Sequence, residues 1–140
     1  MLIISGHPDL KNSVANKAIL EEISAQLPQA EIRKIDELCT NSQFDVKAEQ
    51  AAFEKADIIV FQYPMHRYGL PGLFKLYIDK VMEHGWAYGS QGTALADKPF
   101  IKLKISPPLA SSHRQSKETI RRYYRVHKKF IKLFGWRNVF

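Results

Sequence analysis

The feature that most constrains this chain is a repeated order of short apolar run, polar loop and amphipathic segment. The apolar runs are Leu2-Ile3-Ile4 and residues 57–61. Runs of this length and composition are typical of strands that are buried on both faces of a parallel sheet. Helical spacing of apolar residues follows each run, over residues 13–28 and 71–81. This order predicts right-handed parallel crossovers and a doubly wound sheet.

The remaining elements fit the same plan. Residues 31–35 alternate in polarity and predict a further strand, and residues 46–55 predict a polar helix after a loop through Cys39. Residues 62–69 are interpreted as a loop, because Pro64 interrupts the run. We therefore expect a three-layer α/β/α arrangement with helices on both faces of a parallel sheet.

Length and composition limit the classes of protein to consider. A chain of 140 residues suits one domain over residues 1–140, with a core that needs no disulfide. No stretch approaches the roughly 18 apolar residues of a membrane span, and the first residues do not resemble a secretion signal. The single Cys39 excludes an internal disulfide and an all-cysteine metal site, so we expect a cytoplasmic protein without a metal centre.

Two loops are expected at the carboxyl ends of the strands, where doubly wound sheets bind ligands: residues 5–13 and 62–70. Ser13 and Asn16 stand where the first loop enters a helix, and free backbone N–H groups with the helix dipole favour an anion there. The alternative is that Ser13 only caps the helix, which is the commoner role. The loop has neither a Walker motif nor the glycine pattern of dinucleotide-binding proteins.

His7 and the second loop each allow more than one role. His7 could be a general base, a phosphate donor or a turn residue before proline, and its place beside the anion site favours a donor that positions the ligand. Residues 63–69 combine a proline kink with flat and polarizable side chains, which suits the edge and face of a ring system. The alternative is a loop whose aromatic side chains pack in the core.

Taken together, these residues resemble the flavin-dependent NAD(P)H:quinone oxidoreductases, which have the flavodoxin-like fold. The nearest branch is that of the ancillary proteins of glutathione-regulated potassium efflux, and the resemblance covers residues 2–100. It implies a flavodoxin-like doubly wound parallel sheet that is incomplete at its C-terminal end. The matching motifs are His7-Pro8 with Ser13 and Asn16, Tyr63-Pro64-Met65-His66-Arg67-Tyr68 with Pro71, Leu76-Tyr77-Ile78-Asp79-Lys80-Val81, His84-Gly85-Trp86-Ala87-Tyr88-Gly89, and Gly92-Thr93-Ala94-Leu95.

The resemblance also implies roles for individual residues. The FMN phosphate would be held by His7, Ser13, Val14, Ala15 and Asn16. The isoalloxazine ring would be lined by Pro64, Met65, His66 and Arg67. The substrate pocket would include Tyr68, Trp86 and Tyr88, the last two beside the ring of a partner subunit. No metal ligand is implied.

The activity implied by the resemblance is hydride transfer through flavin N5, from NADH or NADPH to a quinone. The cofactor would be FMN, with FAD as the alternative, and the protein would supply orientation and electrostatics. A homodimer and a membrane potassium-efflux protein are the implied partners, which would place the chain in the cytoplasm or at the inner face of the membrane. The alternative function is a flavodoxin-fold binding or regulatory subunit without turnover.

Residues 101–140 depart from the family. They carry a net charge of +10, whereas residues 1–100 carry −3. Lys102 and Lys104 fit poorly in a central strand buried on both faces, and the prolines at 107–108 lack the N–H groups that the family offers to the flavin ring. Three interpretations stay open: a truncated or frameshifted coding sequence, a native basic amphipathic helix, or a tail for nucleic acid or acidic membranes. The sequence favours the first, and nucleic acid is the least expected partner.

Overall fold

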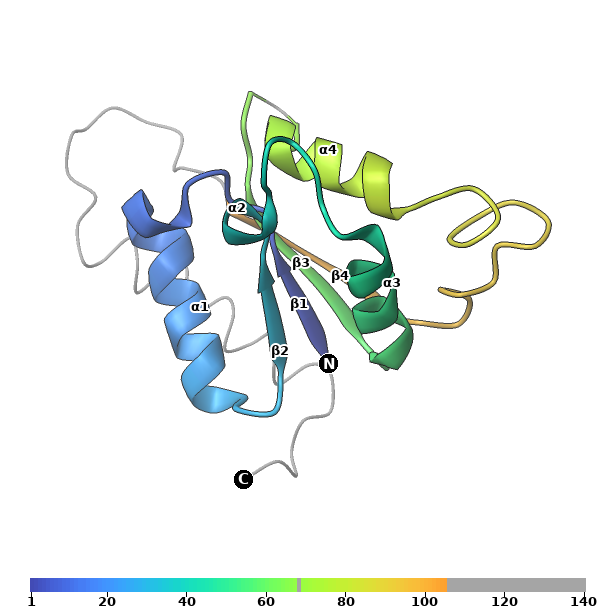
Figure 1. The fold of residues 1–140 in the computed structure, drawn as a ribbon. Helices are drawn as coiled ribbons and strands as arrows, with labels where there is room; N and C mark the ends of the chain where they lie inside the picture. Colours follow the sequence, from blue (N-terminus) through green and yellow to red (C-terminus); the bar gives the residue numbers. More distant parts are fainter. Residues whose placement is uncertain (68, 106–140) are drawn as a thin grey trace. The chain divides into compact units, whose positions relative to one another are not determined.

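The computed structural model describes residues 1–67 and 69–105. Within these residues four parallel strands form one sheet, and helices lie on both of its faces (Figure 1). The predictions for residues 106–140 and for Tyr68 lie outside the described residues. The expectation of one domain over residues 1–140 therefore stays a prediction.

The strand order is β2-β1-β3-β4, with every neighbouring pair parallel. This is the order of flavodoxin-like sheets, whose switch point lies between β1 and β3. The elements are β1 (Leu2–Ser5), the short 3₁₀ helix η1 (Leu10–Asn12), α1 (Val14–Gln26), β2 (Glu31–Lys34), α2 (Ile35–Leu38), α3 (Val46–Lys55), β3 (Ile59–Pro64), α4 (Gly72–Val81) and β4 (Phe100–Ile105).

Two hydrophobic clusters pack against the sheet, one on each face. Successive side chains of a strand point to opposite faces, so Ile3 packs in one cluster with Leu20 of α1, and Ile4 packs in the other with Phe53 of α3 and Phe74 of α4. Figure 1 shows α1 on one side of the sheet and α3 and α4 on the other. The predicted three-layer arrangement is confirmed. None of the helices among residues 1–67 and 69–105 is long and apolar enough to cross a membrane.

The helices begin where the sequence predicts them. Ser13 precedes α1 and its hydroxyl accepts a hydrogen bond from the backbone N–H of Asn16, so the capping role is confirmed. Asp45 caps α3 in the same way through the N–H of Ala48. Helix α4 starts directly after Pro71, which makes no side-chain cap. The four-residue α2 was not expected, because β2 ends at Lys34 and the chain turns into it without a loop.

The expectation of a loop from residue 62 was wrong, because β3 continues to Pro64. Pro64 pairs with Ile105 of β4, and the N–H of Met65 donates to the Ile105 carbonyl at 2.8 Å. Alternate residues face opposite neighbours, so the Pro64 nitrogen faces the side of β1, which has already ended at Ser5. The missing N–H of Pro64 lies beyond the last β1–β3 pair, Ser5 with Gln62, so a proline is tolerated there although it would break a ladder in mid-strand.

The lysines of β4 do not prevent a strand. Residues 100–105 pair with β3 along their whole length, and every second side chain, namely Phe100, Lys102 and Lys104, is exposed. Ile101 and Leu103 point to the other face and pack against the cluster of Ile3. The conflict with a strand buried on both faces is resolved because this face of β4 is open to solvent.

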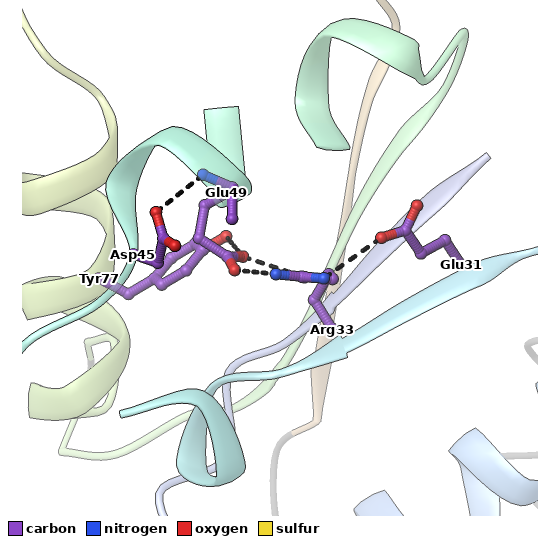
Figure 2. A network of polar contacts seen from close by, with 6 residues as sticks. Glu31, Arg33, Asp45, Glu49 and Tyr77 are labelled. Carbon is purple, nitrogen blue, oxygen red and sulfur yellow. Dashed lines mark hydrogen bonds and ion pairs between the residues drawn. The ribbon is translucent and has the colours of Figure 1, made fainter. Parts of the chain in front are cut away.

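A buried ion pair joins β2 to the helical layer (Figure 2). The Glu49 carboxylate of α3 is bound by the guanidinium of Arg33 and accepts the Tyr77 hydroxyl of α4 at 2.8 Å. Glu49 is 2% exposed, so its charge depends on these two partners. Burial and the Glu49 charge raise the pKa of Tyr77, and the hydrogen bond to Glu49 raises the pKa of Arg33.

Candidate functional site: the carboxyl edge between β1 and β3

A chain of polar side chains crosses the carboxyl ends of β1 and β3. The Ser5 hydroxyl donates to Gln62 Oε1 at 3.4 Å, and Gln62 Nε2 donates to Asn16 Oδ1 at 2.7 Å. Asn16 Nδ2 in turn donates to Ser13 Oγ at 3.1 Å. Ser5, Gln62 and Asn16 are buried. This polar chain, residues 5, 62, 16 and 13, therefore fixes the first turn of α1 against the switch point of the sheet.

The hydrogen bonds of the polar chain all run toward Ser13, so the Ser13 hydroxyl is still able to donate a hydrogen bond. Ser13 Oγ accepts from both the side chain and the backbone N–H of Asn16, which uses its acceptor capacity. Its own hydroxyl hydrogen has no acceptor in the part of the chain that the structure describes. The N–H groups of Val14 and Ala15 belong to the first helical turn, which has no intrahelical acceptors. Val14 is 61% exposed, so this turn faces solvent.

Gly6 lets the loop after β1 leave the sheet close to α4. Its N–H donates to the Gln62 carbonyl at 2.7 Å, which continues the pairing with β3. A Cβ at this position would lie 2.6 Å from the ring of Phe74. The backbone thus approaches an aromatic ring more closely than any side chain would permit, and this approach sets the path of the loop that follows.

His7 follows Gly6 and has one nitrogen engaged. Its Nδ1 accepts the backbone N–H of Asp9 at 3.0 Å, so in the neutral ring the proton is on Nε2. Burial lowers the pKa of His7 from its ordinary value, and the charge of His66 lowers it further, while Asp36 and Asp9 oppose the shift. A neutral His7 with an Nε2–H donor suits the predicted role of positioning a ligand.

The second loop is a tight turn rather than a long excursion. Two backbone hydrogen bonds join His66 and Gly69, at 3.0 and 2.8 Å. Arg67 lies inside the turn with φ 42°, a left-handed conformation that is uncommon for a residue other than glycine. His66 and Arg67 are both exposed. The structure therefore presents a cationic loop tip next to the end of β3.

Trp86 and Tyr88 lie elsewhere in the chain. The Trp86 indole N–H donates to Glu54 at 2.7 Å and its ring packs edge-on against Phe53, both in the last turn of α3. Helix α3 leads into the amino end of β3, opposite the edge that carries Ser13 and His7. Tyr88 is 57% exposed. One chain does not bring these aromatic residues to the loops at the carboxyl edge.

The structure thus brings together most of the predicted cofactor-binding residues. The two groups, around Ser13 and around Met65, follow adjacent strands, and their roles toward a flavin stay predictions. Sequence reasoning missed Ser5, Gln62 and Asp36. A signal existed for the first two, since each is the first polar residue after an apolar run. Nothing in the sequence pointed to Asp36, which lies in the unexpected helix α2. Among residues 1–67 and 69–105, no group of three or more His, Cys, Asp or Glu side chains could hold a metal ion.

Comparison with known families decides the class of the chain. A family model described as having the flavodoxin-like fold matches residues 1–139. The chain belongs to the flavodoxin-like family. The resemblance seen in its motifs is confirmed by a relative from Klebsiella pneumoniae (strain 342), the glutathione-regulated potassium-efflux system ancillary protein KefF, which is 46% identical over 101 residues. That match covers 72% of this chain and 56% of the relative, so the flavodoxin-like chain spans little more than half the length of its relative.

Solved structures of other flavodoxin-like proteins agree. The general stress protein 14 of Treponema denticola, solved in complex with FMN, has a TM-score of 0.73 and 26% identity, over 94% of this chain and 77% of that one. A protein from P. pentosaceus described as an NADPH-quinone reductase has a TM-score of 0.66 and 22% identity, over 94% of this chain and 76% of that one. At that identity the second likeness shows the fold alone.

Proposed function

We propose that this chain binds FMN at the carboxyl edge between β1 and β3 and that it acts as an NAD(P)H:quinone oxidoreductase. The phosphate would lie at the first turn of α1, held by His7, Ser13, Val14, Ala15 and Asn16. The ring would lie along Pro64, Met65, His66 and Arg67. Tyr68, Trp86 and Tyr88 would contribute to the substrate pocket.

One observation carries the phosphate part of this proposal. The polar chain ends in a Ser13 hydroxyl whose acceptor capacity is used by Asn16 and whose own hydrogen has no acceptor among residues 1–67 and 69–105, which supports a role as a donor to a ligand. An outward hydroxyl donor beside free helix N–H groups is matched to an anion. The residues present therefore fit a phosphate. Binding of FMN by a relative of 26% identity supports the choice of this phosphate ester, with FAD as the alternative.

When bound, FMN would accept a hydride from NADH or NADPH and pass it to the acceptor. The protein groups have a supporting part in this chemistry. The turn from His66 to Gly69 fixes the position of Arg67, whose positive charge favours an anionic neighbour. Gly6 leaves room for the Phe74 ring at the point where the first loop leaves β1. Few side chains are then required as general acids or bases.

The partners follow from the relatives and from the position of the aromatic loop. The similarity to a potassium-efflux ancillary protein supports a role beside a membrane potassium-efflux protein, at the cytoplasmic face. Because Trp86 is held at α3, it would reach a flavin site only in a second copy of the chain. A homodimer with sites shared between subunits is therefore part of the proposal.

Binding of flavins to the purified protein tests the proposal. We expect FMN to bind more tightly than riboflavin, because only FMN has the phosphate. Ser13→Ala should weaken FMN binding about tenfold or more, as expected for a lost hydrogen bond to a charged group, and leave riboflavin unchanged. Asn12→Ala is the matched control, since Asn12 lies in the same loop but bonds only to Asp9 among the described contacts.

Turnover is measured separately, as quinone-dependent oxidation of NADH and NADPH by the FMN-loaded protein. Reduction of a quinone supports the enzyme. Tight FMN binding without turnover would instead support the binding or regulatory subunit. Equal affinity for FMN and riboflavin in the wild type would contradict the phosphate site itself.

A further inference from the structure

Asp36 lies at the same edge of the sheet as the proposed phosphate site. Strand β2 ends at Lys34 and α2 begins at once, so Asp36 stands at the carboxyl end of β2, next to the loop that leaves β1. Its Oδ2 accepts the backbone N–H of Leu10 at 2.7 Å, across 26 residues of sequence. Leu10 is buried and begins η1, the short helix between His7 and Ser13. The carboxylate thus anchors the middle of this loop.

Within the described part of the chain, the second carboxylate oxygen of Asp36 is buried without a hydrogen bond that would offset the loss of water. Oδ1 is enclosed by protein and has no hydrogen-bond partner among the described residues. Most buried polar atoms in proteins are hydrogen-bonded, so an enclosed oxygen without a partner requires an explanation. A residue needed only to hold Leu10 could use a neutral amide, because one acceptor atom is enough. The charge of Asp36 therefore points to a second task.

The titratable group that feels this charge is His7. Four influences act on its ionisation: burial and His66 oppose the charged ring, while Asp36 and Asp9 favour it. Asp36 is the larger of the two favourable charges. Asp9 is exposed and binds Asn12 with its side chain, whereas Asp36 Oδ1 is buried without a hydrogen-bond partner among the described residues.

We propose that Asp36 is a positioning residue of the flavin site, which anchors the loop of residues 7–13 through Leu10 and governs the charge of His7 beside the ligand phosphate. The proposal rests on the proposed FMN site for its consequence but not for its mechanism. At high pH His7 is a neutral Nε2–H donor. When the pH falls, the proton is added to Nδ1, which then no longer accepts the Asp9 N–H, and the Asp36 carboxylate offsets part of that cost. The positively charged His7 makes the site more attractive to a dianionic phosphate.

The test is a proton NMR titration of His7 in the protein without flavin. Asp36→Asn keeps an oxygen that can accept the Leu10 N–H but removes the charge, so the pKa of His7 should fall. Asp36→Glu restores the charge and should return the pKa toward that of the wild type. His66→Gln removes the opposing charge and should move the pKa of His7 upward, which shows that the assigned resonance responds to its neighbours. Asp97→Asn is the matched control, because it removes an exposed carboxylate that precedes the amino end of β4, and it should leave the pKa of His7 unchanged.

A structural role alone gives a different result. If Asp36 only anchors Leu10, Asp36→Asn behaves like the wild type in the titration, and this outcome overturns the proposal. If Asp36→Asn is too unstable to titrate, the decision passes to the pair Asp36→Gln and Asp36→Glu, whose side chains have the same length and differ in charge. The pKa of His7 should be lower in Asp36→Gln than in Asp36→Glu, and equal values in the two variants also overturn the proposal.

The effect of Asp36 on flavin binding then tests whether its charge matters for function. At about pH 8, where a His with a lowered pKa is neutral, Asp36→Asn removes a negative charge near the phosphate and should strengthen FMN binding by about twofold to tenfold, with riboflavin unchanged. A shift of the His7 pKa without any FMN binding would support the role of Asp36 and contradict the proposed function. FMN binding that Asp36→Asn does not change, together with an unchanged pKa of His7, would support the proposed function and contradict the role of Asp36.

Discussion

Arg67 is predicted to line the flavin ring, and its backbone has an unfavourable conformation. Its φ of 42° is left-handed, and such a conformation costs a residue with a Cβ roughly 1–2 kcal/mol. Strain of this kind persists where the surroundings enforce it, and it often marks a binding site. In this chain the turn is enforced by the two hydrogen bonds between His66 and Gly69.

Replacement of Arg67 by glycine should therefore stabilise the protein. We expect a gain of about 1 kcal/mol in the free energy of unfolding, measured in urea, because glycine adopts positive φ without strain. Arg67→Ala is the matched control, since it removes the charge and keeps the Cβ, and it should gain little. The same pair of variants tests the proposed cation near the flavin, because both should lower the midpoint potential of bound FMN alike. Equal stability of the two variants would contradict the strain.

His7 makes the stability of the fold depend on pH. Burial lowers its pKa below the ordinary value of 6.5, so the unfolded chain binds more protons than the folded one once the pH drops through that value. The wild type should lose stability as the pH falls below about 7.5, and the loss should continue until the pH has passed the lowered pKa of the folded state. His7→Asn keeps an acceptor for the Asp9 N–H and should flatten this part of the profile, measured by urea unfolding at each pH. An identical slope in both proteins would assign the dependence to another group.

At the scale of elements, the buried ion pair of Figure 2 holds β2, α3 and α4 together. Loss of one partner should be costly, because it leaves another charge or hydroxyl buried without a partner. Glu49→Leu is expected to reduce the free energy of unfolding by about 3 kcal/mol or more. The triple variant Arg33→Met, Glu49→Leu, Tyr77→Phe removes every polar member and should recover most of that loss. A triple variant as unstable as the single one would show that packing, and not charge, is the cause.

The periodicity of the sequence was sufficient for most elements. The apolar residues of α1 and α4 recur every three or four positions, and Ser13 and Asp45 are strong caps, so these helices and α3 could be placed closely. The end of β3 could not, because the effect of Pro64 depends on where β1 stops, which is a property of the sheet and not of the segment. Helix α2 is a single turn, too short to show a period.

The candidate site, like the fold, could be predicted from the sequence only in part. Ser13, Asn16 and the Met65 loop could be found because they follow apolar runs at the edge where ligands bind. Ser5 and Gln62 are predicted as the first residues of the two loops, whereas both lie in strands, and their side chains bond to each other. Asp36 acts through a hydrogen bond across 26 residues of sequence, and no local pattern reports such a contact.

For the whole molecule, the position of Trp86 and Tyr88 predicts sites shared between two copies. Mixing two variants, each inactive by itself, tests whether the sites are shared. Tyr88→Ala should remove quinone reduction while FMN remains bound, and Asn16→Leu should lose FMN because the polar chain is broken. Mixed in equal amounts and allowed to exchange, the two inactive proteins should regain activity, up to about a quarter of the wild-type value, because half of the dimers are mixed and each has one intact site. A mixture that stays inactive would place both residues in the same subunit's site.

The polar chain at the switch point also has a consequence for how such sequences can change. Gln62 donates to Asn16 through the only bond that unites the buried side chains of β3 and α1 among the described contacts. Either amide alone would be buried without its partner, at a cost of about 1–3 kcal/mol. The joint loss of both to apolar residues avoids that cost and leaves only the Ser5 hydroxyl without its acceptor. Positions 16 and 62 should therefore be inherited as a pair. Descendants of one ancestral chain would keep both amides or exchange both, and a lineage caught with only one would be a short-lived intermediate.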